Sequence, residues 1–208
     1  MTDEKDWLFD GPRAARLTIA LAHGAGAPMD SPFMRIVAEG LAKMSYRVVR
    51  FEFPYMHARR EAGKRRAPDR EPALLKAWRY VISRLGDGSR LVIGGKSMGG
   101  RIASMVADET GVAGLVCLGY PFHPPGQPLR QRVAHLENLR TPTLIVQGTR
   151  DQFGRREEVG KYPLSPQIRI AWIENGDHSF KPPARAGVTA AQNINAAINT
   201  VDDFLKTL

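Results

Sequence analysis

The chain has 208 residues and a mass of 23.0 kDa, a size that suits one hydrophobic core. Its hydrophobic content of 43% and charged content of 25% are those of a globular protein, which excludes disordered, collagen-like and repeat proteins. No apolar run has the roughly 18 residues of a membrane-spanning helix, and the first residues are acidic where a signal peptide is basic. We therefore expect one cytoplasmic domain, 1–208, with no membrane contact.

The formal net charge is +9, which raises nucleic acid, a membrane surface or an acidic substrate as partners. Part of this charge lies in the segment 58–70, which holds six basic and two acidic side chains. Because Gly63 and Pro68 interrupt any helical pattern there, we expect a solvated loop, with contact to an anion as the alternative. No nucleic-acid-binding motif accompanies the charge, so nucleic acid is not the expected partner.

Strand and helix patterns alternate along the chain. Short apolar runs rich in β-branched and aromatic residues predict strands, and apolar side chains three or four residues apart predict helices. In chain order these patterns are strand 15–22, helix 32–44, strand 46–53, the basic segment, helix 74–85, strand 90–93, helix 99–109, strand 111–119, strand 143–147, strand 168–173 and a closing amphipathic helix over 194–208. A shorter pattern at Trp7, Leu8 and Phe9 would fit an edge strand.

This alternation predicts an α/β fold. Strands joined through helices form right-handed crossovers, so we expect one mainly parallel sheet of about six to seven strands with helices on both faces, a three-layer sandwich. The segment 120–141 begins with a proline-rich loop, 121–128, and has room for only one short helix. We therefore expect little or no lid over the carboxyl ends of the strands.

The unusual residues of the sequence follow predicted strands. The segment 23–26, His-Gly-Ala-Gly, follows the first strand, the segment 95–99 ends a later one, and Asp151 and His178 follow the last two. In a parallel sheet the carboxyl ends of the strands meet at one edge, where ligands bind. We expect these residues to form one site.

The segment 95–99 reads Gly-Lys-Ser-Met-Gly, a G-x-S-x-G pattern between a predicted strand and a predicted helix. In that setting a sharp turn exposes Ser97 as a nucleophile, and the glycines let strand and helix approach closely. The backbone N–H of Met98 begins the helix, where it can stabilise the oxyanion of a tetrahedral intermediate. Ala25, in a loop of small residues, is expected to supply the second N–H of this oxyanion hole.

A serine hydroxyl needs a base, and the base needs a group that fixes its tautomer. His178 and Asp151 suit these roles, because the order Ser97, Asp151, His178 is that of nucleophile, acid and base on such a sheet. Asp177 is an alternative acid partner, but adjacent side chains on a loop seldom meet, so we expect it to hold the turn. The segment is not a phosphate-binding P-loop, since that pattern needs glycine where Arg90 stands.

Several side chains near the same sheet edge are candidates for a substrate pocket, namely Met29, Tyr55, Lys96, Phe122, His123 and Phe180. An ammonium group of Lys96 in the pocket would favour an anionic substrate, and the alternative is an ammonium group in solvent or paired with an acid. His123 can line the pocket or serve packing. We expect His23 to brace its loop and His135 to lie on a helix surface.

On these segments and on the order of Ser97, Asp151 and His178, the chain resembles the α/β-hydrolase superfamily over nearly its whole length. More narrowly, the segments 23–30, 59–66 and 94–101 are similar to those of small lidless bacterial hydrolases related to testis-expressed-thirty and NSL-complex-subunit-three proteins. Dienelactone hydrolases are more distant relatives, and they use cysteine where this chain has serine. The resemblance implies an intracellular serine hydrolase in which these three residues form the catalytic triad.

We therefore expect a serine hydrolase that cleaves a small ester, thioester or lactone through an acyl-enzyme intermediate. The alternative is a catalytically silent binding or scaffold protein, because a fold does not establish activity. No metal or organic cofactor is expected, since no His, Asp and Cys cluster has the spacing of metal ligands. The single cysteine, Cys117, lies in an apolar run and is expected to be a small buried side chain.

Overall fold

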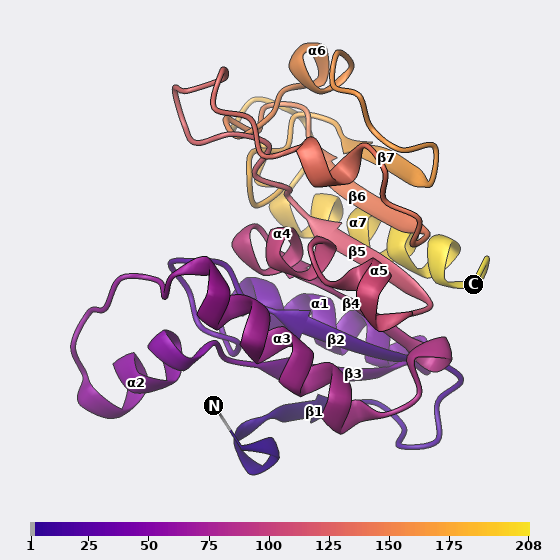
Figure 1. Cartoon of the computed structure of the whole chain (residues 1–208). Coiled ribbons are helices and arrows are strands. Elements are labelled where there is room, and N and C mark those ends of the chain that lie inside the picture. The colour runs from indigo at the N-terminus through magenta and orange to yellow at the C-terminus, as the bar shows by residue number, and fades with distance from the viewer. Residues whose placement is uncertain (1–2) are drawn as a thin grey trace.

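Seven strands form one sheet in the computed structural model, which describes residues 3–208 (Figure 1). Their order across the sheet is β1-β3-β2-β4-β5-β6-β7. Their bounds are β1 (Leu8–Asp10), β2 (Thr18–Ala22), β3 (Arg47–Phe51), β4 (Leu91–Lys96), β5 (Gly114–Leu118), β6 (Thr143–Gly148) and β7 (Ile168–Ile173). Residues 1 and 2 of the expected single domain lie outside the described residues.

The neighbouring strands from β3 across to β7 all pair in parallel, and β1 pairs antiparallel with β3 at the edge. This confirms the expected mainly parallel sheet and its short edge strand. From β2 the chain moves outward to β3, then returns to β4 on the other side of β2 and continues outward to β7. The strand order therefore reverses between β2 and β4, and at such a reversal the loops after two neighbouring strands border a crevice.

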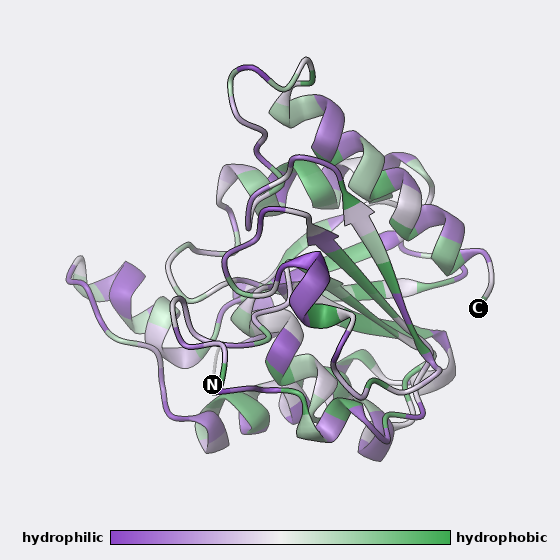
Figure 2. Ribbon diagram, turned by 90° about the horizontal axis from the view of Figure 1, so that it is seen from above, coloured by the Kyte–Doolittle hydropathy of each residue, from purple (hydrophilic) through white to green (hydrophobic). Residues whose placement is uncertain are grey.

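Helices cover both faces of the sheet, with the apolar strands between them (Figures 1 and 2). The helices are α1 (Pro32–Lys43), α2 (Pro54–Ala62), α3 (Glu71–Leu85), α4 (Met98–Ser104), α5 (Ala107–Thr110), α6 (Arg156–Val159) and α7 (Ala190–Leu205). Side chains alternate between the faces of a strand, so Ile19 and Leu21 of β2 pack with α1 and α7, while Ala20 and Ala22 pack with α3 and α4. The result is the expected three-layer α/β sandwich.

The basic segment 58–70 is partly helical, which corrects the expectation of a loop throughout. Pro54 occupies the first turn of α2, where its missing N–H costs no hydrogen bond, and the helix continues through Arg59 and Arg60 to Gly63 in a left-handed conformation. Only the residues after Gly63 form the irregular connection to α3. Figure 1 shows α2 and this connection projecting from the body of the molecule.

Two other helices differ from their predicted bounds. The helix expected over 99–109 is two helices, α4 and α5, and the Ser104 hydroxyl donates to the Arg101 carbonyl oxygen where α4 ends, in competition with the regular helix bonds. The closing helix α7 begins at Ala190 instead of 194 because the Thr189 hydroxyl accepts a hydrogen bond from the Gln192 backbone nitrogen and caps it.

Within residues 3–208, no lid covers the carboxyl edge of the sheet. The described segment between β5 and β6 holds one short element, the 3-10 helix η3 (Ala134–Leu136). No helix in residues 3–208 combines the length and apolar character needed to cross a membrane.

Candidate active site

Ser97 stands at the turn between β4 and α4, with a positive φ of 52°. Non-glycine residues rarely adopt this conformation, and it costs about 1–3 kcal/mol. The turn is held by a hydrogen bond from the Ser97 backbone nitrogen to the Leu118 carbonyl oxygen (3.0 Å). A side chain on either Gly95 or Gly99 would overlap the Ala22 carbonyl oxygen, so only glycine lets β4 and α4 pack this closely against β2. The sequence motif thus corresponds to a strained, half-buried serine.

Asp151 orients the imidazole ring of His178. The Nδ1 of His178 lies 2.7 Å from Oδ2 of Asp151, which follows β6 and is completely buried. This carboxylate also accepts hydrogen bonds from the Gln147 side-chain amide (2.9 Å) and the Phe153 backbone nitrogen (2.9 Å). With its proton on Nδ1, His178 keeps the lone pair of Nε2 available as a base.

Asp177 holds the loop that carries His178. Its Oδ1 accepts hydrogen bonds from the backbone nitrogens of Ser179 (2.8 Å) and Lys181 (2.9 Å). The side chain is therefore engaged in the turn, as expected, and the acid beside the imidazole ring is Asp151.

Ser97 and His178 line one cavity of about 310 Å³ at the carboxyl edge of the sheet. The remaining lining is mostly small or apolar and consists of Gly24, Ala25, Gly26, Ala27, Ser31, Phe33, Met34, Lys96, Phe153 and Ser179. A cavity of this size suits a small organic group. In the described chain no hydrogen bond joins the Ser97 hydroxyl to His178. Such bonds in ligand-free sites often form only with substrate present.

The loop after β2 is braced from behind. The Nε2 of His23 accepts a hydrogen bond from the Phe53 backbone nitrogen (3.1 Å), so its proton lies on Nδ1, which donates to the Gly24 carbonyl oxygen (2.7 Å). Burial lowers the pKa of His23, which agrees with this neutral ring. The Tyr55 hydroxyl donates to the Ala25 carbonyl oxygen (3.0 Å). The bracing role expected of His23 is confirmed.

The two residues expected to donate to an oxyanion are Met98, which follows Ser97 in sequence, and Ala25, which lies near Ser97 in space. Met98 is the first residue of α4, so its N–H has no partner in a preceding helical turn. Ala25 lines the cavity with Ser97, and a Cβ on the preceding Gly24 would lie 3.6 Å from the Cβ of Ser97. Ala25 and Met98 therefore both lie close to Ser97.

Lys96 is buried with 8% of its surface exposed, and it lines the cavity. Its Nζ donates to the His178 carbonyl oxygen (2.6 Å) and lies 5.6 Å from the centre of the Phe33 ring. Burial lowers the pKa of Lys96 to about 7, against the opposing effect of the Asp151 and Asp177 carboxylates. The alternative of an ammonium group in solvent is wrong, because the hydrogen bond to His178 holds it inside.

Burial also lowers the pKa of His178, and the positive charge of Lys96 acts in the same direction. The hydrogen bond to Asp151 opposes this shift. The Phe153 ring lies against the imidazole ring, with 4.3 Å between ring centres, and shields it from water. His178 is therefore neutral, and able to accept a proton, at neutral pH.

Of the six side chains expected in the pocket, only Lys96 lines it. The other five are buried elsewhere: Met29, Tyr55, Phe122, His123 and Phe180. Tyr55 braces the Ala25 loop, Phe180 packs against Phe33, and Phe122 packs against Tyr120 and Tyr162. These five expectations are corrected: a position near a strand end does not decide whether a side chain faces the crevice or the core.

The histidines outside the site have packing partners. His123 is buried, with Nδ1 2.8 Å from the Pro124 carbonyl oxygen and Nε2 3.5 Å from Glu158. His135 is half-buried in η3, and its Nε2 lies 2.8 Å from the Ser104 hydroxyl oxygen. The expected surface position of His135 is therefore wrong, because the ring turns inward toward α4.

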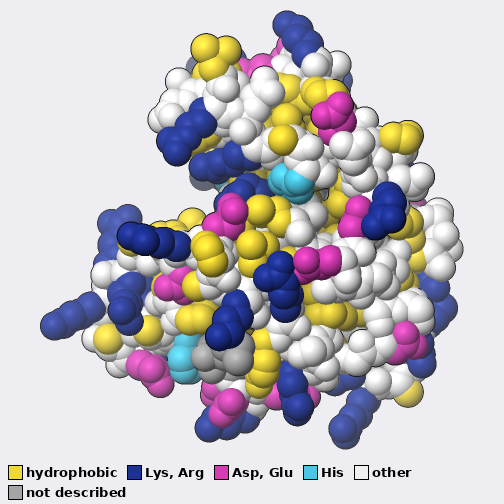
Figure 3. Space-filling view, viewed as in Figure 1, with side chains coloured by type: hydrophobic (Ala, Val, Ile, Leu, Met, Phe, Trp, Pro, Cys, Tyr) yellow, Lys and Arg dark blue, Asp and Glu magenta, His cyan; other side chains and the backbone are white. Residues whose placement is uncertain are grey.

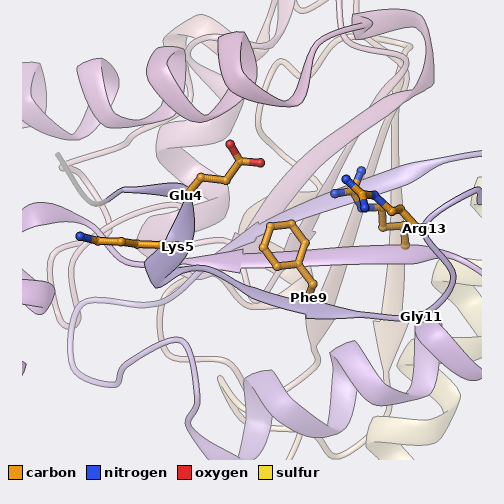
Figure 4. A pocket seen from close by; sticks show the side chains of 6 residues that line it. Glu4, Lys5, Phe9, Gly11 and Arg13 are labelled. Atoms are coloured by element: carbon orange, nitrogen blue, oxygen red, sulfur yellow. The ribbon is translucent and has the colours of Figure 1, made fainter.

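A separate cavity of about 520 Å³ lies beside β1, lined by Glu4, Lys5, Phe9, Gly11, Arg13 and Arg47 (Figure 4). This lining contains no serine or cysteine and no histidine, so it offers no nucleophile with a base. A search of residues 3–208 finds no group of three His, Cys, Asp or Glu side chains that could hold a metal ion. The Ser97 cavity, in contrast, is lined by both a serine and a histidine.

The chain belongs to the alpha/beta hydrolase domain family, which it matches over residues 15–206. Its fold is similar to that of an alpha-beta serine hydrolase homologue from Coxiella burnetii, with a TM-score of 0.69 at 18% identity over 97% of this chain and 90% of that chain. It is also similar to XC6422 from Xanthomonas campestris, described as a serine hydrolase without lid, with a TM-score of 0.70 at 15% identity over 97% and 88% of the two chains.

A dienelactone hydrolase from Anabaena variabilis has a TM-score of 0.68 to this chain at 19% identity, over 97% of this chain and 90% of that chain. These similarities establish the lidless α/β-hydrolase fold. They extend over nearly the full length of both proteins in each pair.

Proposed function

We propose that the protein is a serine hydrolase in which Ser97 is the nucleophile, His178 the base and Asp151 the group that orients the base. The observation that carries this proposal is the placement of His178, bonded to buried Asp151 at 2.7 Å, in the same cavity as the strained Ser97. Nucleophile, base and orienting acid in this arrangement are the requirements of acyl transfer. Membership of the hydrolase family supports the same reaction class.

In the proposed reaction, Nε2 of His178 takes the proton of Ser97 as its oxygen attacks the acyl carbon. The negative oxygen of the tetrahedral intermediate accepts hydrogen bonds from the backbone nitrogens of Met98 and Ala25. The leaving group then departs with the proton from His178, and an acyl-enzyme remains. Water repeats the steps, which releases the acid and regenerates the Ser97 hydroxyl.

The proposed substrate is a small ester, thioester or lactone. A cavity of about 310 Å³ and the short segment between β5 and β6 favour a compact substrate that enters an open site. The similar structures include an enzyme described as a dienelactone hydrolase, which supports the lactone and ester classes. We further propose the narrower relationship to testis-expressed-thirty and NSL-complex-subunit-three proteins, on the segments 23–30, 59–66 and 94–101.

Hydrolysis of p-nitrophenyl butyrate and of a butyryl thioester tests this proposal. We expect Ser97→Ala and His178→Ala to lose nearly all turnover, and Asp151→Asn to lose about three to four orders of magnitude in kcat while keeping a residual rate. Asp203→Asn, on the exposed side of α7, is the matched control and should keep the wild-type rate. Circular dichroism checks that each variant folds.

If Ser97→Ala hydrolysed these substrates at the wild-type rate, the proposal would be contradicted. A folded wild-type protein without turnover on any of these substrates would favour the silent scaffold instead. Loss of turnover in Asp177→Asn, with Asp151→Asn unaffected, would reverse the assignment of the acid.

A further inference from the structure

A second hollow adjoins the proposed active site across the loop after β2. It has a volume of about 680 Å³ and is lined by Ala25, Gly26, Arg59, Arg65, Arg66, Ala67 and Pro68. Ala25 and Gly26 line this hollow and the Ser97 cavity as well, so the two spaces meet at the proposed oxyanion loop. We call the second hollow the arginine groove.

The three arginines of the groove have no acidic partner. Across residues 3–208, Arg59, Arg65 and Arg66 form no ion pair and no side-chain hydrogen bond, whereas Arg60 is paired with Asp30 (2.9 Å) and Glu52 (2.6 Å). The guanidinium groups that face the groove are therefore available to a ligand. Figure 3 shows Lys and Arg side chains gathered over the projecting part of the molecule that contains α2.

The groove is tied to the active site by defined contacts. Asp69, just after the groove residues, accepts a hydrogen bond from the Tyr55 backbone nitrogen (2.9 Å) and so fixes the end of the loop to the start of α2. The Tyr55 hydroxyl in turn donates to the Ala25 carbonyl oxygen (3.0 Å). The pairs of Arg60 with Asp30 and Glu52 join α2 to the loop before α1 and to the residue that follows β3. These bonds connect the lining of the arginine groove to the lining of the Ser97 cavity, so one ligand could contact both.

We infer that the substrate is an acyl ester or thioester whose leaving group carries phosphate, with the phosphate bound in the arginine groove. This inference rests on the proposed function. Guanidinium groups bind phosphate oxygens through paired, charge-assisted hydrogen bonds. The apolar side of the Ser97 cavity, formed by Phe33, Met34 and Phe153, suits a small acyl group, so the leaving group extends past Ala25 toward the arginines.

The proposed reaction is a hydrolysis, so water is the only reactant besides the substrate. The oxygen of Ser97 forms a bond to the acyl carbon, the carbon–sulfur or carbon–oxygen bond to the phosphorylated group breaks, and the leaving thiol or alcohol takes the proton from His178. Water then releases the acid from Ser97. The phosphate remains on the leaving group, so its role is binding and orientation.

Coenzyme A and pantetheine are suitable probes, because they share the thiol arm and differ in the phosphorylated nucleotide. Calorimetric titration into folded Ser97→Ala measures binding without turnover. We expect coenzyme A to bind at least about tenfold more tightly than pantetheine, because guanidinium groups form charge-assisted hydrogen bonds with phosphate oxygens. Adding Arg65→Gln and Arg66→Gln should remove this preference and leave pantetheine binding unchanged.

The matched control is Lys43→Gln with Arg169→Gln, which removes the same net charge. Both residues are exposed and do not line the arginine groove: Lys43 ends α1, and Arg169 lies near the start of β7. It should keep the preference for coenzyme A within about twofold. Equal binding of the two probes, or equal loss in both double variants, would overturn the inference. So would binding of a short DNA duplex that depends on Arg65 and Arg66 while coenzyme A does not bind.

Turnover separates failure of the inference from failure of the proposed function. With the wild-type protein, kcat/KM for butyryl-coenzyme A should exceed that for butyryl-pantetheine, mainly through KM, and Arg65→Gln with Arg66→Gln should abolish the difference. Normal hydrolysis of p-nitrophenyl butyrate by the same double variant would show an intact catalytic site. Hydrolysis of both thioesters at equal kcat/KM would overturn the phosphate inference alone.

Discussion

The Phe153 ring lies against the imidazole ring of His178, with 4.3 Å between the ring centres. The backbone nitrogen of Phe153 donates a hydrogen bond to the Asp151 carboxylate. One residue thus contacts both the proposed base and the acid that orients it. The ring contributes to the burial of the imidazole, and burial is the largest cause of the lowered pKa of His178.

Phe153→Ala should therefore raise the pKa of His178 toward its ordinary value of about 6.5 and lower kcat by up to about tenfold. The measurement is the acidic limb of kcat/KM for p-nitrophenyl butyrate against pH. Phe9→Ala, at an exposed position on the edge strand β1, is the control. An acidic limb that stays at its wild-type position in Phe153→Ala would show that the ring does not exclude water from the base.

Lys96 should set the pH response of the site. Its positive charge lowers the pKa of His178, so Lys96→Met should raise that pKa and move the acidic limb of kcat/KM to higher pH. The same variant loses the hydrogen bond from Nζ to the His178 carbonyl oxygen, so kcat should also fall. Lys76→Met, exposed on α3, is the control. A limb that moves to lower pH in Lys96→Met would contradict this electrostatic account.

The burial of Lys96 also predicts a pH dependence of stability. Its pKa is about 7 in the folded protein and 10.5 in its ordinary state, so between these values the unfolded chain binds one more proton. The free energy of unfolding of the wild type should then rise with pH relative to Lys96→Met, by up to about 1.4 kcal/mol for each pH unit. Urea unfolding of both proteins at pH 7.5 and 8.5 measures this. Parallel behaviour of the two proteins would exclude a buried, titrating Lys96.

Glycine at position 99 should be required for full stability. A Cβ there would overlap the Ala22 carbonyl oxygen, where α4 approaches β2. We expect Gly99→Ala to lower the free energy of unfolding by about 2–4 kcal/mol. At Gly160 a Cβ would meet its nearest neighbour, the Arg156 carbonyl oxygen, at 3.4 Å, so Gly160→Ala should change stability by less than about 0.5 kcal/mol. Chemical denaturation of both variants measures the difference, and equal stabilities would contradict this packing.

The sequence predicted the elements whose signals are local. The G-x-S-x-G pattern located the turn at Ser97, and the apolar runs located six of the strands, because a buried parallel strand is apolar on both faces. The triad candidates followed from their order after successive strands. Asp177 was separated from Asp151 by the turn chemistry of its loop, and the hydrogen bonds to Ser179 and Lys181 agree with that reasoning.

The pocket was harder to predict because it depends on side-chain direction. Tyr55 follows β3 as expected, but it lies in the first turn of α2, a helix that the basic composition concealed, and it points toward the Ala25 loop. Phe153 lines the cavity, although only its position two residues after Asp151 could have suggested it. The sequence left the position of Lys96 open between the pocket and solvent, because its hydrogen-bond acceptor, the His178 carbonyl oxygen, lies 82 residues away in sequence.

The most direct test of the central claim is covalent labelling by a fluorophosphonate, read by intact mass and peptide mapping. The account predicts one adduct on the wild-type protein, located on Ser97, none on folded Ser97→Ala, and normal labelling of Ser83→Ala, an exposed serine of α3. An unlabelled but folded wild-type protein, or an adduct that persists in Ser97→Ala, would contradict the assignment of Ser97 as an activated nucleophile.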